Sequence, residues 1–210
     1  MRGVVISAGS MEPLCFYQNM IQADDFVVCA DGGYLHAAAL GITPDLLIGD
    51  FDSFSGALPS GVKTVRLPCR KDYTDTHECV QALLERGIKD ILLLGCMGTR
   101  FDHSYANLCL LKFIKDHGGR GVLKDACNEI FLLEGHVPIS GKKGDLVSLI
   151  PFTDVVEGIT THDLEYPLFD ARMEKGVSIG VSNVMEKDGA AVTVKKGILL
   201  CIKSKDRWNS

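Results

Sequence analysis

The sequence predicts a mixed α/β fold of two domains, with a mainly parallel sheet and flanking helices first and an all-β sandwich second. Before Asn128, short continuous apolar runs alternate with segments of helical period. Continuous apolar runs are typical of strands buried on both faces, and their alternation with helices favours a parallel sheet. After Asn128 the runs shorten and turn residues crowd together, which indicates a sandwich or a barrel.

We place the domain boundary at Ala126, which gives an N-terminal domain of residues 1–126 and a C-terminal domain of residues 127–210. Apolar residues make up 46% and charged residues 23% of the chain, as in ordinary globular proteins, so a disordered tail is excluded. A chain of this length buries about 70% of its unfolded surface and needs neither disulfides nor metal to fold.

The N-terminal domain is expected to contain six strands and four helices. The strands follow the apolar runs Val4–Ile6, Phe26–Ala30, Leu46–Ile48, Thr64–Leu67, Ile91–Leu94 and Val122–Leu123. The helices are predicted over Glu12–Gln22, Gly33–Leu40, Asp75–Arg86 and Ser104–His117. The third helix has the clearest signals, because Asp75 and Glu78 resemble a capping pair and Gly87 follows its last turn.

In the C-terminal domain the pattern predicts short strands and no long helix. The expected strands are Val147–Ile150, Val177–Val181, Ala191–Val194 and Ile198–Ile202. The last two are separated by Lys195, Lys196 and Gly197, which we interpret as a turn.

The charge of the chain bears on its partners. The formal net charge is -5 and no basic block occurs, whereas nucleic-acid-binding proteins usually carry a basic stripe. We therefore expect no nucleic-acid partner, and a small cationic or metal-chelated ligand fits better.

Eight cysteines are present, yet no two form a C-x-x-C pair, so the usual zinc and redox spacings are absent. Several lie inside apolar runs, such as Cys29 and Cys201, and are expected to be buried reduced thiols. Free thiols at this density point to a reducing compartment. Since no apolar run approaches the length of a membrane span and no signal peptide is indicated, we expect a cytoplasmic protein without a membrane partner.

Acidic residues gather where predicted strands end or predicted helices begin. The segments are Asp31-Gly32-Gly33, Gly49-Asp50-Phe51-Asp52-Ser53, Lys71-Asp72-Tyr73-Thr74-Asp75 and Gly98-Thr99-Arg100-Phe101-Asp102-His103. Ligands of open parallel sheets bind at the carboxyl ends of the strands, so these segments are expected to surround one crevice.

Asp50 and Asp52 are two residues apart and point the same way in extended backbone. Two such carboxylates can bind Mg²⁺, which prefers oxygen ligands and commonly shares them with substrate phosphates. Alone, the pair could equally be a turn, since Asp and Ser are common there. The repetition of acids on the same sheet edge favours the metal. Without a cation, grouped carboxylates repel one another, which raises the pKa of some of them.

Two further features suit a phosphate-bearing ligand. Gly32 and Gly33 could let a phosphate approach a helix N-terminus, or could simply form a tight turn. Lys71 and Arg100 could hold phosphate oxygens, or could be ordinary solvated cations. Neither a Walker A motif nor G-x-G-x-x-G occurs.

The histidines give no clear signal. His77 and His103 stay ambiguous, because neither has a metal-ligand spacing partner, and a zinc site is not expected. A triad of Ser104, His103 and Asp102 is rejected, because adjacent helical residues do not face one another and no G-x-S-x-G elbow exists.

Taken together, these segments resemble the thiamine pyrophosphokinase family of bacterial type. The motifs that carry the resemblance occur in family order over the whole chain: Cys-Ala-Asp-Gly-Gly (29–33), Gly-Asp-Phe-Asp-Ser (49–53), Lys-Asp-Tyr-Thr-Asp (71–75), Gly-Thr-Arg-Phe-Asp-His (98–103) and Val-Ser-Asn (181–183). Gly-Asp-Phe-Asp-Ser is the most specific of them. One departure is Thr99, where the family commonly has glycine; Arg100 and Asp102 remain.

The resemblance implies a reaction and its cofactors. The family transfers the pyrophosphoryl group of ATP to the hydroxyl of thiamine, giving AMP and thiamine diphosphate, and it requires Mg²⁺. It implies an α/β catalytic domain that binds ATP and Mg²⁺, a β-sandwich for thiamine binding and dimerisation, and a homodimer with sites between subunits.

The same resemblance implies functional roles for individual residues of this sequence. Metal-binding and catalytic positions are matched by Asp50, Asp52 and Asp75, with Arg100 and Asp102 also in the catalytic set. Nucleotide-binding positions are matched by Asp31, Gly32, Gly33, Lys71, Asp72 and Arg100. Thiamine-binding positions are matched by Tyr166, Ser182 and Asn183, although Tyr166 could also be a half-buried aromatic of a sheet.

Three questions stay open at this level. Either Asp75 or Asp102 could accept the proton of the substrate hydroxyl. A different hydroxyl compound could be the acceptor. The same site could also belong to a nucleotide- or thiamine-sensing module that binds without turnover, although pure binding seldom needs so many carboxylates.

Overall fold

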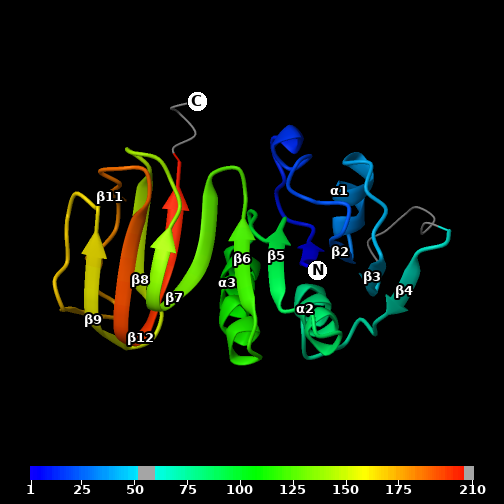
Figure 1. The fold of residues 1–210 in the computed structure, drawn as a ribbon. Coiled ribbons are helices and arrows are strands. Elements are labelled where there is room, and N and C mark those ends of the chain that lie inside the picture. Colours follow the sequence, from blue (N-terminus) through cyan, green and yellow to red (C-terminus); the bar gives the residue numbers. More distant parts are fainter. Residues whose placement is uncertain (52–59, 206–210) are drawn as a thin grey trace. The chain divides into compact units, whose positions relative to one another are not determined.

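The computed structural model describes residues 1–51 and 60–205 and shows a mixed α/β protein (Figure 1). The chain forms two compact units, Met1–Ala126 and Cys127–Ser210, which we call unit 1 and unit 2. In the described residues, no helix is both long and apolar enough to cross a membrane.

Unit 1 is built on a parallel sheet. Its strands are β1 (Gly3–Ile6), β2 (Phe26–Ala30), β3 (Leu46–Gly49), β4 (Lys63–Arg66), β5 (Asp90–Leu94) and β6 (Arg120–Lys124). They lie in the order β6-β5-β1-β2-β3-β4, and each neighbouring pair is parallel. The chain therefore leaves β1 in one direction through β2 to β4 and then returns to the other side of β1 with β5. The carboxyl ends of β1 and β5 thus form the switch point where open sheets bind ligands.

Three α-helices connect these strands: α1 (Gly33–Ala39), α2 (Asp75–Glu85) and α3 (Phe101–Asp116). Helix α2 is capped by Thr74, whose hydroxyl accepts the amide N–H of His77, so Asp75 is the first helical residue rather than the cap. At its other end the amide of Gly87 bonds the carbonyl of Leu84 with a φ of 76°, a conformation that glycine adopts freely.

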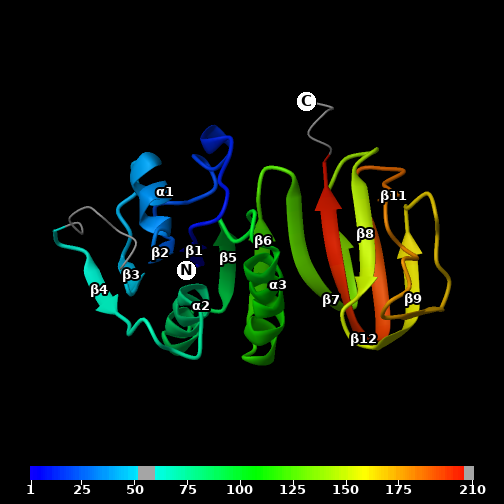
Figure 2. The ribbon, with the colours of Figure 1, turned by 180° about the vertical axis from the view of Figure 1, so that it is seen from behind.

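The helices cover both faces of the sheet. A core on one face contains Val4, Ile6 and Cys29, with Ala37 of α1 against it. On the opposite face, α2 and α3 pack directly on glycines of the sheet. Leu83 of α2 lies so close to Gly3, and side chains of α3 lie so close to Gly121, that a Cβ at either glycine would contact them. Helix α3 lies behind β6 in Figure 1 and in front of it in Figure 2. Strands β1 and β3 are fully buried between these layers, as their continuous apolar sequences predict.

Two expectations for unit 1 are wrong. The helix expected over Glu12–Gln22 is a 3-10 turn, η1 (Leu14–Phe16), in an irregular segment. Its apolar side chains pack individually into the core, with Tyr17 completely buried, and this packing outweighs their helical spacing. Strand β4 is exposed along its length because it lies at the edge of the sheet, not in its buried interior (Figure 1).

Unit 2 is antiparallel. Its strands are β7 (Asn128–Ile139), β8 (Leu146–Pro151), β9 (Val155–His162), β10 (Ala171–Glu174), β11 (Asn183–Val184) and β12 (Ala190–Ser204). Strand β12 pairs with β7 along both of its halves. On its other side, residues 191–196 pair with β9 and residues 199–204 pair with β8. The single strand β12 thus pairs with β9 through its first half and with β8 through its second half. That the strands of unit 2 pack as the two layers of a sandwich stays a prediction.

Two strand predictions in unit 2 are wrong. The segment Val177–Val181 is not a strand, and strand β10 lies just before it. Lys195, Lys196 and Gly197 are not a turn between two strands but part of β12. The register of β12 against β7 shifts between Val194 and Leu199, and Gly197 has a φ of 88°. These residues therefore form a bulge inside a continuous strand, and in sequence such a bulge resembles a turn.

Candidate active site

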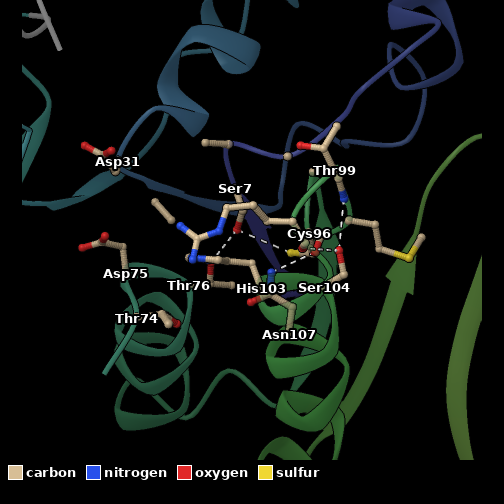
Figure 3. Close-up of a pocket in the computed structure, with 17 residues that line it drawn as sticks. Ser7, Asp31, Thr74, Asp75, Thr76, Cys96, Thr99, His103, Ser104 and Asn107 are labelled. Carbon is tan, nitrogen blue, oxygen red and sulfur yellow. Dashed lines mark hydrogen bonds between the residues drawn. The ribbon is translucent and has the colours of Figure 1, made fainter. Parts of the chain in front are cut away.

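A cavity of about 380 Å³ lies at the carboxyl ends of β1 and β5 in unit 1 (Figure 3). Its walls come from the ends of β1, β2 and β5 and from the first turns of α2 and α3: Ser7–Gly9, Ala30, Asp31, Thr74–Thr76, Gly95–Arg100, His103, Ser104 and Asn107. It therefore occupies the switch point of the sheet, where the crevice was expected.

Glycines let the loops around the cavity approach one another. A Cβ at Gly9 would collide with the carbonyl oxygens of Gly95 and Met97, and a Cβ at Gly33 would collide with that of Ile6. The amide of Gly9 donates to the carbonyl of Gly95 over 2.7 Å, which joins the loops after β1 and β5. No larger residue fits these two positions without moving backbone.

The floor of the cavity is a buried polar network that the motifs did not reveal. The hydroxyls of Ser7 and Thr76 lie 2.9 Å apart, and the thiol of Cys96 donates to Ser7 over 3.4 Å. The amide of Asn107 donates to the carbonyl of Cys96 over 2.8 Å, so the network joins β1, α2, β5 and α3 (Figure 3). Burial raises the pKa of Cys96 to about 12, which keeps it a neutral thiol.

Sequence signals for this floor were weak. Ser7 directly follows a predicted strand, and Asn107 lies one helical turn after His103. Neither position belongs to a motif, so only the fold brings them together.

Asp31 stands at the acidic side of the cavity, on the same side as Asp75 in Figure 3. Burial raises the pKa of its carboxyl, and the charges of Asp75 and Asp50 raise it further, against the hydrogen bonds from the amides of Gly32 and Phe51. Its Oδ1 is buried and accepts no hydrogen bond from the residues that the structure describes. This is a carboxylate cluster that a cation would stabilise.

Lys71 neutralises part of this cluster. Its ammonium lies 2.8 Å from Asp75 and 3.5 Å from Asp50, and each of these three side chains is less than a quarter exposed. Burial alone would lower the pKa of Lys71, but the hydrogen bond to Asp75 and the charges of both carboxylates outweigh it, and the pKa is raised. Lys71 is therefore a charged partner of the site and not a solvated surface lysine.

Arg100 lines the cavity and holds Asp102. Its guanidinium donates two hydrogen bonds to that carboxylate, at 2.6 and 3.2 Å. Both side chains are well exposed, and the hydrogen bonds from Arg100 lower the pKa of Asp102. The side chain of Asp102 pairs with Arg100, and Asp102 does not line the cavity. Arg100 also precedes the first residue of α3.

The other predicted nucleotide-binding residues are placed as follows. Gly32 and Gly33 follow Asp31 and begin the seven-residue helix α1, with Gly33 buried. Asp72 is exposed in the loop after Lys71. Thr99 and His103 line the cavity, whereas His77 does not and stacks on Tyr73 instead.

Asp52 and Ser53 lie outside the described residues, so the expected metal set of Asp50, Asp52 and Asp75 is not tested. In residues 1–51 and 60–205, no three metal-ligating side chains are grouped closely enough to hold an ion. The oxygen-rich cluster of Asp31, Asp50 and Asp75, with a buried unpartnered oxygen on Asp31, nevertheless has the donor chemistry that suits Mg²⁺.

The predicted thiamine-binding residues lie together in unit 2. Asn183 is buried, and its side chain accepts the amide of Tyr166 over 2.9 Å and donates to the carbonyl of Tyr166 over 2.8 Å. The amide of Ser182 donates to Ser148, and its φ of 58° is left-handed. Tyr166 is 64% exposed, so it is not the half-buried sheet residue of the alternative interpretation. Asn183 therefore holds the backbone that presents Tyr166.

Comparison with known proteins gives matches over both units. Residues 17–120 match the family model described as thiamin pyrophosphokinase, catalytic domain, and residues 136–199 match the thiamin pyrophosphokinase, vitamin B1 binding domain. Thiamine pyrophosphokinase 1 of rice is 30% identical over 176 residues, which span 76% of this chain and 66% of the rice protein.

Bacterial relatives match over more of their length. Thiamine pyrophosphokinase of Bacillus subtilis is 27% identical over 184 residues, 84% of this chain and 86% of the relative. The crystal structure of thiamine pyrophosphokinase from Bacillus subtilis superposes with a TM-score of 0.88 at 25% identity, covering 98% of this chain and all of that chain. With both halves matched by models of one family and the fold shared throughout, the chain belongs to the thiamine pyrophosphokinase family of enzymes.

Proposed function

We propose that the protein transfers the pyrophosphoryl group of ATP to the hydroxyl of thiamine, giving AMP and thiamine diphosphate, in a Mg²⁺-dependent reaction. The observation that carries the proposal is the cavity of unit 1 at the switch point of a parallel sheet, which is lined by Asp31, Asp75 and Arg100. Lys71 does not line this cavity but forms an ion pair with Asp75, which does. Pyrophosphoryl transfer is mostly positioning and stabilisation of charge, and such a site supplies both.

Arg100 and Lys71 are proposed to bind phosphate oxygens of ATP. Arg100 already borders the cavity and offers a fork of donors that suits phosphate. Lys71 is held beside the carboxylates and contributes a compact charge. The backbone of Gly32 and Gly33 lies at the start of α1, where amide groups can face an anion. Asp72 belongs to the same proposed nucleotide-binding set.

Asp50, Asp52 and Asp75 are proposed to hold Mg²⁺, and the raised pKa of Asp31 indicates that a cation is favoured beside them. When bound, the ion would neutralise charge on the transferring phosphates. The carboxylates would act on the phosphates through this ion, since on their own they repel phosphate charge.

In the proposed reaction, a bond forms between the thiamine hydroxyl oxygen and the β-phosphorus of ATP. The bond from that phosphorus to the oxygen bridging it to the α-phosphorus breaks, and AMP leaves. The hydroxyl proton passes to a carboxylate. Asp75 lines the cavity and Asp102 does not, so we assign this proton to Asp75 and leave Asp102 to orient Arg100.

Unit 2 is proposed to bind thiamine and to support dimerisation. The exposed ring of Tyr166 can stack on the cationic thiazolium, with Ser182 nearby and Asn183 fixing the backbone.

We further propose a homodimer with sites between subunits, and a cytoplasmic location in keeping with eight free cysteines. Light scattering after gel filtration tests the dimer, and an active species that is strictly monomeric would contradict it.

The acceptor is tested by a panel of hydroxyl compounds with ATP and Mg²⁺, in which AMP is separated from ADP by chromatography. AMP is expected with thiamine and with no other acceptor at comparable rates. Asp50→Asn should abolish AMP formation while the protein remains folded. A faster acceptor would move the assignment to that compound, and saturable thiamine binding without AMP would identify a sensing module.

A further inference from the structure

An aromatic stack runs from the loop before α2 onto α3. The rings of Tyr73 and His77 are stacked, with centroids 4.3 Å apart and planes at 16°. His77 contacts Phe113 of α3 at 4.5 Å, and Phe113 contacts His117 at 4.2 Å. His117 is fixed in turn by its ring nitrogen, which lies 2.8 Å from the carbonyl oxygen of Phe113. The stack thus joins a loop residue to two packed helices.

The loop that Tyr73 belongs to carries the charged residues of the site. Lys71 lies two residues before Tyr73 and Asp75 two residues after it. Residues 67–74 form no helix or strand, and residues 68–73 make no backbone–backbone hydrogen bond to other described residues. Side-chain contacts must therefore hold this loop, and these are the pairs of Lys71 with Asp50 and Asp75 and the stack of Tyr73.

The stack on His77 is the contact that accounts for the position of the Tyr73 ring. Tyr73 is 53% exposed and does not line the cavity, so neither core packing nor contact with the site accounts for its position. His77, by contrast, lies within helix α2, and its ring contacts Phe113 of α3. One ring face of Tyr73 is therefore held against a residue that does not move with the loop.

We propose that Tyr73, His77 and Phe113 form an aromatic clamp that holds the loop of residues 68–74, and that Tyr73 is a positioning residue for Lys71 and Asp75. The effect on catalysis rests on the proposed pyrophosphoryl transfer. The clamp itself does not, because it is a statement about the loop in the free protein.

The test compares Tyr73→Ala, which removes the ring, with Tyr73→Phe, which keeps it. Leu35→Ala is the control, because Leu35 is a similarly exposed apolar side chain on α1 that does not line the cavity. Amide hydrogen exchange is measured at His77 and Glu78, whose amides donate to the hydroxyl and the carbonyl of Thr74 at the end of the loop. The melting temperature is measured for each variant, together with kcat and KM for ATP and thiamine.

Tyr73→Ala is expected to speed exchange of the two amides bonded to Thr74. It should also lower kcat about tenfold, because small misplacements of catalytic groups are costly. Its melting temperature should stay within a few degrees of the parent protein, since a half-exposed ring contributes little to the core. Tyr73→Phe should behave as the parent protein in every measurement, and so should Leu35→Ala.

Each contrary result is informative. Unchanged exchange in Tyr73→Ala would overturn the clamp, and faster exchange with unchanged kcat would overturn the positioning role. Equal loss of kcat in Tyr73→Phe and Tyr73→Ala would make the hydroxyl the functional group, which contradicts the stack. A parent protein that forms no AMP would refute the proposed function alone, because the exchange measurement still decides the clamp.

A double-mutant cycle adds an independent check. If Tyr73 acts through His77, then His77→Ala should speed exchange of the Glu78 amide as Tyr73→Ala does. The double variant should then be no worse than the poorer single variant. Additive effects of the two substitutions would contradict a shared clamp.

Discussion

The ammonium of Lys71 lies 2.8 Å from the carboxylate of Asp75, which begins helix α2 one turn further along the chain. The same ammonium lies 3.5 Å from Asp50 at the end of β3. One lysine therefore bridges two carboxylates that come from different elements and are both proposed to bind metal. It stabilises the acidic cluster in the free protein, and we propose that it also binds the phosphates of ATP.

Removing this lysine should harm activity more than folding. Lys71→Met is expected to lower kcat/KM for ATP about a hundredfold, because it removes a charge aimed at the transferring phosphates. Lys71→Arg should recover part of the loss. Lys63→Met on the exposed edge strand β4 is the control and should act as the parent protein. Steady-state AMP formation measures all three, and an active Lys71→Met would remove this residue from the mechanism.

Asp31→Asn is expected to separate stability from activity. The folded-state pKa of Asp31 lies above its ordinary value, so its ionised form destabilises the fold at neutral pH. Asparagine removes that charge and tolerates the left-handed φ of 43°, so the melting temperature should rise at pH 7 while activity falls at least tenfold.

The stabilisation expected for Asp31→Asn should depend on pH, and the raised pKa of Asp31 gives the direction. As pH falls through the raised pKa, wild-type Asp31 takes up a proton in the folded state and its penalty shrinks. Below the ordinary pKa it is protonated in both states and the penalty disappears. The difference in melting temperature between Asp31→Asn and the parent protein should therefore shrink on acidification. A lower melting temperature of Asp31→Asn at pH 7 would mean that its carboxylate is stabilising.

The cysteines should differ sharply in reactivity. Burial raises the pKa of Cys29, Cys96 and Cys201 to about 12, so these thiols stay protonated and inaccessible at pH 8. Cys15 and Cys69 are exposed and should react first with iodoacetamide. Mass spectrometry of peptides locates the adducts, and unfolded protein serves as the control in which all eight react. Early modification of Cys96 would show that the cavity floor opens.

The backbone of Gly33, at the start of α1, lies so close to the backbone of Ile6 that a larger residue should destabilise the protein. A Cβ at Gly33 would collide with the carbonyl of Ile6, and Gly33→Ala should lower the free energy of unfolding by about 2 kcal/mol. Gly98→Ala is the matched control, because the nearest atoms to its Cβ lie 3.6 Å away. Urea unfolding compares the two, and equal stability would mean that the loops around the cavity can separate freely.

The sequence allowed much of unit 1 to be predicted, because its central strands are buried on both faces and read as unbroken apolar runs. Phe26–Ala30 is a strand over the expected residues, and Asp31 follows it into the cavity. The acidic cluster was also predicted, since parallel strands bring their carboxyl ends to one edge.

Other features depend on contacts that no local pattern records. A bulge at Gly197 resembles a turn in sequence but continues β12, because pairing with β7 resumes at Leu199. The helix expected at Glu12–Gln22 failed because the burial of Tyr17 outweighs helical spacing. Ser7 and Asn107 are ordinary polar residues until the fold places both beside Cys96.

The most direct test of the proposed reaction uses ATP labelled at its β-phosphorus. The purified protein is incubated with this ATP, Mg²⁺ and thiamine, and the products are separated by chromatography. The account predicts that the label appears in thiamine diphosphate, with one unlabelled AMP for each molecule formed. Label recovered in ADP would show that only the γ-phosphoryl group moves, and would contradict pyrophosphoryl transfer.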